Sequence, residues 1–398
     1  MTAAMTHVLG GTRVVEQGTF ITGPCAGMML ADLGADVIKV ESPAGDPYRF
    51  YQGGQFSPHF QAYNRNKRSV ALDLHGEADR ALFDELVSGA DVYIQNFRPG
   101  TAERLGVGVQ RLQQLNPRLV YCSISGFGST GPYADRPSYD SVAQALSGFL
   151  SVVVDPDRPR FMGPALADAI TGIYAAYGVL GALVERGRTG RGRLVEVSML
   201  EAMAHFAVEP FAAFFALGDI PTSSDRPRLA QAYILRTADG GLIAVHLSSL
   251  EKFWQGLIRA LDSDELHSDE RFATRQARID NYAALTAALD RLFSRQSTQH
   301  WVERLSVHDV PFAPIHRVDE VVGDPQVRHL DLIVPVENAH GGARAVRPAI
   351  QFDGARAAHV RTAPLLDEHG SAIRQAMASD CPWPEPAGPA EHRPAQSG

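Results

Sequence analysis

The sequence predicts an α/β protein with an open, mostly parallel sheet in a large first domain and a smaller α+β domain after it. Short apolar runs typical of buried strands alternate with helical patterns along residues 1–217. From residue 231 the pattern changes to a hairpin followed by several helices. The length of 398 residues also suits two domains or one elaborated domain.

The first β-α-β unit lies at the N-terminus. Residues 12–16 and 37–41 have the apolar character of buried strands, and residues 24–33 between them have a helical apolar face. This unit predicts a Rossmann-like large domain, and an acid at the end of the second strand raises the question of a dinucleotide. The connecting loop and first helix turn carry three spaced glycines, Gly18, Gly23 and Gly27. They do not form the tight Gly-x-Gly-x-x-Gly turn that brings a backbone against a pyrophosphate, so a nicotinamide cofactor is not expected.

Polar and basic residues border the next two predicted strands. The run Asn64-Arg65-Asn66-Lys67-Arg68-Ser69 precedes the strand at 70–73, and Asn96-Phe97-Arg98-Pro99-Gly100 ends the strand at 91–96. Ligands of open α/β sheets bind at the ends of strands. The second motif therefore indicates a ligand site, whereas a solvated loop is the simpler interpretation of the first.

Asp168 stands at the start of a predicted helix that ends near Gly187. A carboxylate in the first turn of a helix meets unpaired amide groups and the positive end of the helix dipole. We therefore expect Asp168 to stay ionised and oriented. Spacing alone favours a plain capping role, because most acids at this position only complement their helix.

Composition excludes several functional classes. The net charge of -8 argues against nucleic acid or an anionic membrane as the main partner. Three cysteines, Cys25, Cys122 and Cys381, without a Cys-x-x-Cys pair indicate neither a disulfide framework nor a zinc site, and the histidines lack metal-ligand spacing. The N-terminus has no signal-peptide pattern and no run of about 18 apolar residues occurs, so a cytoplasmic protein without a membrane partner or bound metal is expected.

The expected domain boundaries follow from these patterns. Residues 1–217 form the large domain, and residues 218–230, rich in Pro, Ser and Asp, form a linker. Residues 231–325 form the small domain, which opens with strands on either side of an Asp-Gly-Gly turn. Residues 326–398 are expected to return to the large domain and pack on it, with a loose Pro-rich tail from residue 382.

These motifs together resemble the class III CoA-transferases of the CaiB/BaiF type, from about Leu9 to His369. The matching segments are the approach to Asp168 at 163–168, the following strand and helix at 190–201, the motifs at 66–69, 96–100 and 137–140, and the closing motif at 364–369. The resemblance implies a ring-like subunit in an interlocked homodimer. It also implies that acyl-CoA and a small carboxylic acid are the substrates, with coenzyme A as substrate and not as a permanently bound cofactor.

The resemblance also assigns roles to residues. Asp168 matches the catalytic nucleophile of the family. The positions that surround CoA in the family are Leu72, Asp73, His75, Asn96, Phe97, Arg98, Arg104, Tyr139 and Asp140. Cations suit the phosphates of CoA, and apolar or aromatic side chains suit its adenine.

Two alternatives to a CoA-transferase remain: an acyl-CoA racemase or epimerase of the same superfamily, and a CoA-binding protein without catalysis. The racemase branch resembles this chain but carries a His where Tyr139 stands. Epimerisation needs a second acid-base group opposite the aspartate, and a tyrosine hydroxyl with a reference pKa of about 10 is a poor base at neutral pH. The sequence therefore favours the transferase.

Overall fold

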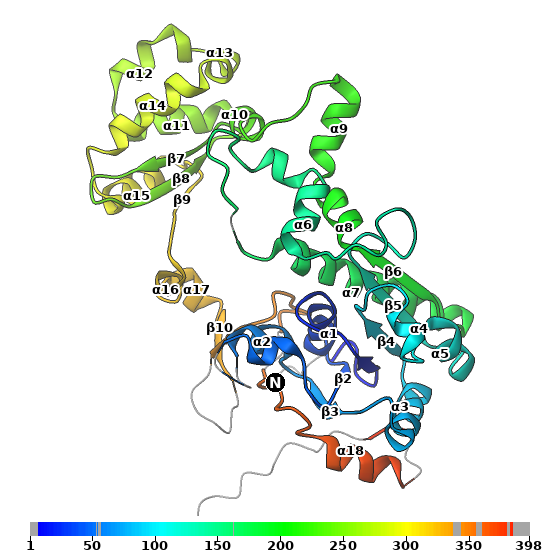
Figure 1. Ribbon diagram of the computed structural model, residues 1–398. Helices are drawn as coiled ribbons and strands as arrows, with labels where there is room; N and C mark the ends of the chain where they lie inside the picture. Colours follow the sequence, from blue (N-terminus) through cyan, green and yellow to red (C-terminus); the bar gives the residue numbers. More distant parts are fainter. Residues whose placement is uncertain are drawn as a thin grey trace, which may run out of the picture. The chain divides into compact units, whose positions relative to one another are not determined.

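The computed structural model describes residues 7–52, 54, 57–161, 163–336, 344–355, 360–379 and 383–384 (Figure 1). The chain divides into two compact units. The small unit comprises Leu150–Arg160 and Glu209–Leu330, and the large unit comprises the other described residues. The expected loose tail lies outside the described residues, except for residues 383–384.

The large unit contains the expected α/β sheet, and all six of its strands are parallel. The strands are β1 (Arg13–Glu16), β2 (Asp36–Glu41), β3 (Arg68–Ala71), β4 (Val92–Gln95), β5 (Val120–Ser125) and β6 (Leu194–Ser198). Their order is β3-β2-β1-β4-β5-β6. The chain moves outwards from β1 to β3 and then returns to place β4 on the other side of β1. This reversal creates a switch point between β1 and β4, where open α/β sheets bind their ligands.

Helices cover both faces of this sheet. Successive residues of each strand point to opposite faces and are apolar, so both faces need to be covered. Val14 lies in the core formed with α1 (Thr22–Asp32) and α7 (Leu166–Thr189). Val15 lies in the opposite core, which is formed with α3 (Glu77–Gly89), α5 (Val109–Leu115) and α18 (Gly370–Met377). Figure 1 shows α18 beside α3, although the two helices are far apart in the sequence.

The remaining helical elements of the large unit are short and connect the strands. They are η1 (Pro47–Phe50), α2 (Pro58–Asn64), α4 (Thr101–Arg104), α6 (Asp140–Leu146) and α8 (Met199–Phe206). A 3-10 turn, η3 (Phe149–Val152), leads into the small unit. Helix α7 is long and apolar enough to cross a membrane, but it packs on α1, α8 and the sheet as a core helix.

The last part of the chain joins the large unit by a small hairpin, β10 (Ile333–Pro335) and β11 (Arg344–Val346), and by α18. Residues 349–352 form no strand, and Phe352 makes only an isolated bridge with Ala355. Trp383 is buried, and its indole nitrogen donates to the Asp36 carboxylate at 2.7 Å.

The small unit has its own sheet and core. Strands β7 (Ala232–Arg236) and β8 (Leu242–His246) form the predicted antiparallel hairpin, and β9 (Phe312–Pro314) adds a third strand that was not predicted. The helices of this unit and its entrance are α9 (Val208–Leu217), α10 (Asp225–Ala230), α11 (Glu251–Leu261), α12 (Asp264–Ser268), α13 (Arg275–Asp280), α14 (Tyr282–Phe293), α15 (Thr298–Val307), α16 (Val318–Val321) and α17 (Pro325–His329), with the 3-10 turn η4 (Glu270–Phe272).

The expectation of a plain linker near this region needs correction. Residues 199–217, which precede it, form two helices, α8 and α9, with Ala207 between them. The segment expected to be a plain linker at 218–230 contains α10, which packs on β7. Its end is fixed by the Arg275 guanidinium, which donates to the Leu229 carbonyl at 2.7 Å, so local composition concealed a tertiary contact.

Helices α1 and α7 approach closely at Gly172, and this contact can be tested. A Cβ atom at position 172 would lie 2.6 Å from Cβ of Cys25. Gly172→Ala should therefore lower the free energy of unfolding by about 1–3 kcal/mol in urea denaturation. Gly181→Ala is the matched control on the same helix, since no heavy atom lies within 4 Å of its added Cβ. It should raise the stability by about 0.5–1 kcal/mol, and equal effects of the two changes would contradict the close approach.

Candidate active site

A cavity of about 580 Å³ opens at the carboxyl edge of the large sheet. Residues 19–22 and 96–99, which follow β1 and β4, form one part of its wall. Residues 124–126 at the end of β5 and Asp168 in the first turn of α7 form another part. The cavity therefore lies at the switch point of the sheet. The predicted residues Asn96, Phe97, Arg98, Tyr139 and Asp168 all line it.

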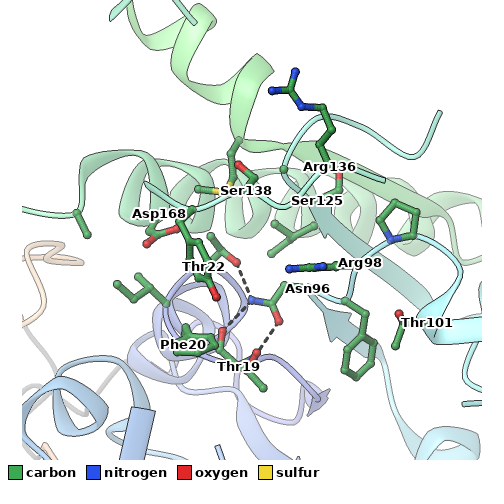
Figure 2. A pocket seen from close by; sticks show the side chains of 18 of the residues that line it. Thr19, Phe20, Thr22, Asn96, Arg98, Thr101, Ser125, Arg136, Ser138 and Asp168 are labelled. Atoms are coloured by element: carbon green, nitrogen blue, oxygen red, sulfur yellow. Dashed lines mark hydrogen bonds between the residues drawn. The ribbon is translucent and has the colours of Figure 1, made fainter. Parts of the chain in front are cut away.

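Asn96 holds the loop that follows β1. Its side-chain oxygen accepts from the Thr19 amide at 2.9 Å, and its side-chain nitrogen donates to the Thr19 carbonyl and the Thr22 hydroxyl, each at 2.8 Å. Figure 2 shows these three bonds, with Asp168 beyond Thr22. Because both polar atoms of the Asn96 amide are occupied by the loop, Asn96 shapes the cavity wall.

A network of buried ion pairs also holds the loop that follows β1. Glu16, Lys39 and Lys67 have fully buried side chains, and the Glu16 carboxylate accepts from Lys39 at 3.3 Å and Lys67 at 2.8 Å. Lys39 also donates to the Gly18 carbonyl, and Lys67 to the Pro24 carbonyl. Burial opposes the charges of Glu16 and Lys39, yet the lysines lower the pKa of Glu16 and the acids around Lys39 raise its pKa, so both remain charged. For Lys67 burial outweighs the attraction of Glu16 and lowers its pKa to about 8.

Asp46 extends this network to Phe20. The Asp46 carboxylate lies 3.1 Å from the Lys39 ammonium and accepts from the Phe20 amide at 3.2 Å. Phe20 has a φ of +60°, a conformation that few residues other than glycine adopt. This strained backbone is held by its contacts and turns the Phe20 ring towards Tyr48 and Tyr139, with ring centroids 5.7 and 6.3 Å away.

Aromatic side chains therefore line the cavity near Asp168. Phe20, Tyr48 and Tyr51 belong to this wall but were not predicted from the sequence. Phe20 carries no sequence signal, since its position depends on the ionic network. Tyr48 follows an Asp46-Pro47 step, and an acid before a proline often starts a helical turn. The Asp46-Pro47 step follows the end of β2 closely, and it was the sequence signal that could have pointed to Tyr48.

The Asp168 carboxyl departs from the sequence expectation. Burial raises the pKa of Asp168 to about 7, and the negative charge of Asp140 adds to the rise. The helix start was expected to keep this carboxylate fully ionised. The expectation was wrong, because it weighed the helix dipole without the loss of water and without a second acid at the same helix end.

Asp140 is the second acid, and it does not line either cavity described here. One of its carboxylate oxygens accepts from the amides of Ala167 at 2.7 Å and Asp168 at 3.3 Å. The other oxygen accepts from the Gln144 side chain at 2.6 Å. In the structure the Asp140 carboxylate thus binds the start of α7. The resemblance, by contrast, assigned Asp140 to contact with CoA.

Three more predicted residues, Leu72, Asp73 and His75, line a second cavity of about 200 Å³. Phe97 and Thr19 line both cavities. The wall of the second cavity follows the carboxyl ends of β2 and β3. Seven of the nine positions assigned to CoA by the resemblance, all except Arg104 and Asp140, therefore line these two adjacent cavities or the wall that they share.

Cations lie at the first cavity but not beside Asp168. Arg98 and Arg136 are exposed arginines of its wall. Arg136, which was not predicted, lies over the Tyr133 ring at 4.5 Å. Arg104 donates to the Thr101 hydroxyl at 2.7 Å and lines neither cavity. In the part of the chain that the structure describes, no three His, Cys, Asp or Glu side chains gather as metal ligands would.

Known proteins are similar to this chain in sequence and in fold. The sequence model of CoA-transferase family III matches residues 9–370. The acetyl-CoA:oxalate CoA-transferase of Acetobacter aceti is 34% identical over 377 residues, covering 93% of this chain and 95% of that protein. The succinate–glutarate CoA-transferase of Agrobacterium fabrum is 33% identical over 379 residues, covering 92% and 94%. The crystal structure of a CaiB/BaiF family protein from Brucella suis superimposes with a TM-score of 0.83 at 36% identity, covering 93% and 99%.

The raised pKa of Asp168 predicts a pH-dependent stability. Well below pH 4 the carboxyl is protonated in the folded and unfolded states, and it contributes no difference. Between about pH 4 and pH 7 the unfolded chain releases a proton that the folded protein keeps, so the stability falls over this range and then stays constant above about pH 7. Asp168→Asn should therefore raise the free energy of unfolding at pH 8 by at most about 4 kcal/mol, with the gain vanishing towards pH 4.

Chemical denaturation at pH 4, 6 and 8 measures this effect. Asp135→Asn, at an exposed aspartate of the large unit, is the control and should show no such pH dependence. An equal effect of Asp168→Asn at all three pH values would contradict the raised pKa.

Proposed function

This chain belongs to CoA-transferase family III, as its motifs predicted, and we propose that Asp168 is the nucleophile by which it moves coenzyme A from an acyl-CoA donor to a carboxylic acid acceptor. One observation carries the role of Asp168. Its carboxyl is the acid that lines the switch-point cavity, where residues that the family resemblance assigns to CoA binding also lie. The acids themselves are not specified by this argument, since the relatives named above differ in theirs.

In the first half of the reaction the Asp168 carboxylate attacks the thioester carbonyl of the donor. The carbon–sulfur bond breaks, and CoA leaves as a thiolate while Asp168 and the acyl group form a mixed anhydride. The thiolate then attacks the aspartyl carbonyl of this anhydride. The donor acid leaves as a carboxylate, and Asp168 carries CoA as a thioester.

The second half reverses these steps with the acceptor. Its carboxylate attacks the aspartyl thioester, the thiolate leaves, and a new mixed anhydride forms. The thiolate attacks the acceptor carbonyl of that anhydride, which gives the new acyl-CoA and restores the Asp168 carboxylate. No proton, electron or water is consumed overall, so the enzyme mainly has to hold the reacting groups together and exclude water.

The two adjacent cavities suit a long substrate such as CoA. Arg98 lies in the wall of the first cavity, where a guanidinium would bind a phosphate. Leu72 and Phe97 offer an apolar wall in the second cavity, which suits the adenine. The thioester would then reach Asp168 at the aromatic end of the first cavity.

The racemase alternative needs a second acid-base group facing Asp168. Tyr139 takes the position that a histidine holds in that branch, and the Tyr139 side chain is 61% exposed and packs edge-on against Phe20. This aromatic environment supplies no partner that would make the hydroxyl a base. A CoA-binding protein without catalysis would not require an acid in the cavity, and Asp168 argues against that alternative.

We also propose that the protein is a homodimer. Helix α9 carries one charged residue, Glu209, and is otherwise apolar, yet no residue of it is buried within the subunit, and Phe215 and Leu217 are 77% and 72% exposed. A helix that is almost entirely apolar is normally buried, so a second copy is expected to cover it. Sedimentation should give a dimer that persists on dilution, and a monomer at micromolar concentration would contradict the proposal.

The transferase activity is tested with succinyl-CoA, or another acyl-CoA, and a panel of carboxylic acids. New CoA esters should form with the wild-type protein and be lost in Asp168→Ala and Asp168→Asn, because both variants lack the nucleophile. Binding of CoA should stay within a few-fold in both variants. Hydroxylamine should trap an Asp168 hydroxamate, visible by peptide mass spectrometry, from wild-type protein incubated with acyl-CoA.

The same assay separates the alternatives. Undiminished transfer in Asp168→Ala would overturn the role of this residue. Interconversion of 2-methylacyl-CoA epimers at a rate comparable with transfer, lost in Tyr139→Phe, would show that the protein is a racemase. CoA binding without any turnover would favour a binding protein.

A further inference from the structure

The start of helix α7 is capped by an acid from another helix. The residue before α7, Ala165, makes no side-chain cap, and the amides of Ala167 and Asp168 instead donate to one oxygen of Asp140 at 2.7 and 3.3 Å. Asp140 is the first residue of α6 and precedes these two by 27 and 28 positions in the sequence. The contact therefore ties the helix that carries the candidate nucleophile to a different segment of the chain.

The contact leaves Asp140 with no free carboxylate oxygen on the cavity side. Its second oxygen accepts from the Gln144 side chain, one turn further along α6, at 2.6 Å. Asp140 is absent from the walls of both cavities, whereas its neighbour Tyr139 lines the first. The side chain thus faces the protein, and its negative charge lies beside Asp168 without reaching the substrate cavity.

We propose that Asp140 is a positioning residue for the reaction: its carboxylate fixes the first turn of α7 and places a negative charge beside the Asp168 carboxyl. This inference rests on the proposed transferase function of Asp168. It reassigns Asp140 from the CoA-contacting role that the family resemblance implied.

The charged groups around Asp168 support this role. The groups that interact with its carboxyl are Asp140 from α6, Cys25 from α1, Tyr48 from η1 and Tyr63 from α2. Burial raises the pKa of all three neutral groups, to about 11 for Cys25 and about 12 for Tyr63, so none of them carries a charge near pH 7. Among the described residues, Asp140 is the charge that acts on Asp168, and no cation offsets it.

A carboxylate in this setting differs from an exposed one in reactivity. Burial and Asp140 raise the pKa of Asp168 to about 7, which makes its carboxylate more basic and hence a stronger nucleophile while a large fraction stays ionised at neutral pH. The position of the Asp168 main chain is kept at the same time, because the backbone amides of Ala167 and Asp168 donate hydrogen bonds to Asp140. Asp140 thereby couples the placement of the nucleophile to the pH range in which it works.

Asp140→Asn separates the two effects. The asparagine side-chain oxygen can still accept from both amides, but the negative charge is gone. The acidic limb of the pH profile for CoA transfer should move to lower pH by about half a unit or more. CoA binding should stay within about threefold of wild type, as the side chain lies outside the cavity walls. Asp140→Ser, a neutral side chain that can also cap a helix, is measured in parallel in case the asparagine variant does not fold.

Glu77→Gln provides the matched control. Glu77 is an exposed acid in the first turn of α3 and is absent from the walls of both cavities. Its removal should leave the pH profile of transfer unchanged. A purely structural role for Asp140 would lower the thermal stability of the variants but leave the acidic limb in place, and that result would overturn the proposal. A large loss of CoA affinity with an unmoved limb would instead restore the CoA-contacting role and equally overturn it.

A second measurement does not depend on enzymatic activity. The stability of wild type, Asp140→Asn, Asp168→Asn and the double variant is measured by chemical denaturation at pH 8. Asp168→Asn should stabilise the wild-type background more than the Asp140→Asn background, because the unfavourable pair of charges is already gone in the latter. Additive effects would overturn the proposal. Suppose that neither the wild type nor any variant transfers CoA. If the effects of the two substitutions on stability are still non-additive, the proposed transferase function fails, but the interaction between Asp140 and Asp168 is supported.

Discussion

The candidate site depends on the balance of buried charges that holds the loop after β1. Glu16, at the end of β1, pairs with the buried Lys39 and Lys67, and Asp46 supplies a second negative charge beside Lys39. The same lysines donate to the carbonyls of Gly18, in the loop, and Pro24, in the first turn of α1. Removing one partner would leave a buried charge without compensation, which typically costs about 3–5 kcal/mol. Because this loop forms the cavity wall at the switch point, the shape of the cavity is decided by groups that no substrate touches.

The sequence was a good guide to whatever depends on local pattern. Continuous apolar runs separated by helical patterns predicted the parallel sheet, because neighbouring residues such as Val14 and Val15 are apolar for both faces of a covered sheet. The motif resemblance identified the family. These two predictions were confirmed because each rests on residues near one another in the sequence or on motifs of fixed spacing. The structure also places Asp168, Asn96 and Tyr139 in the wall of one cavity, and their roles stay predictions.

The failures share a physical cause: they concern groups whose state depends on distant partners. Asp168 lies at a helix start that should favour its charge, but burial and Asp140 reverse that preference. Phe20 takes its left-handed backbone because Asp46, on a different segment, accepts from its amide. The region at 218–230 has a linker's composition but folds against β7. Burial and tertiary charge are not visible in local composition, so no propensity argument could have found these features.

The large unit is discontinuous, and this has a consequence for how the protein is made. Residues near both ends of the chain build it: Trp383 donates to Asp36 across 347 positions, and the buried Arg49 donates to the Pro364 carbonyl across 315. A ribosome delivers the N-terminal strands long before these C-terminal groups. The emerging sheet therefore lacks part of its final contacts at first: the Arg68 guanidinium can already pair with Asp36, but its bond to the Pro384 carbonyl forms only when the C-terminal segment arrives. Contacts over such distances generally form slowly, so we expect the N-terminal strands to stay incompletely covered until the C-terminal segment has been made.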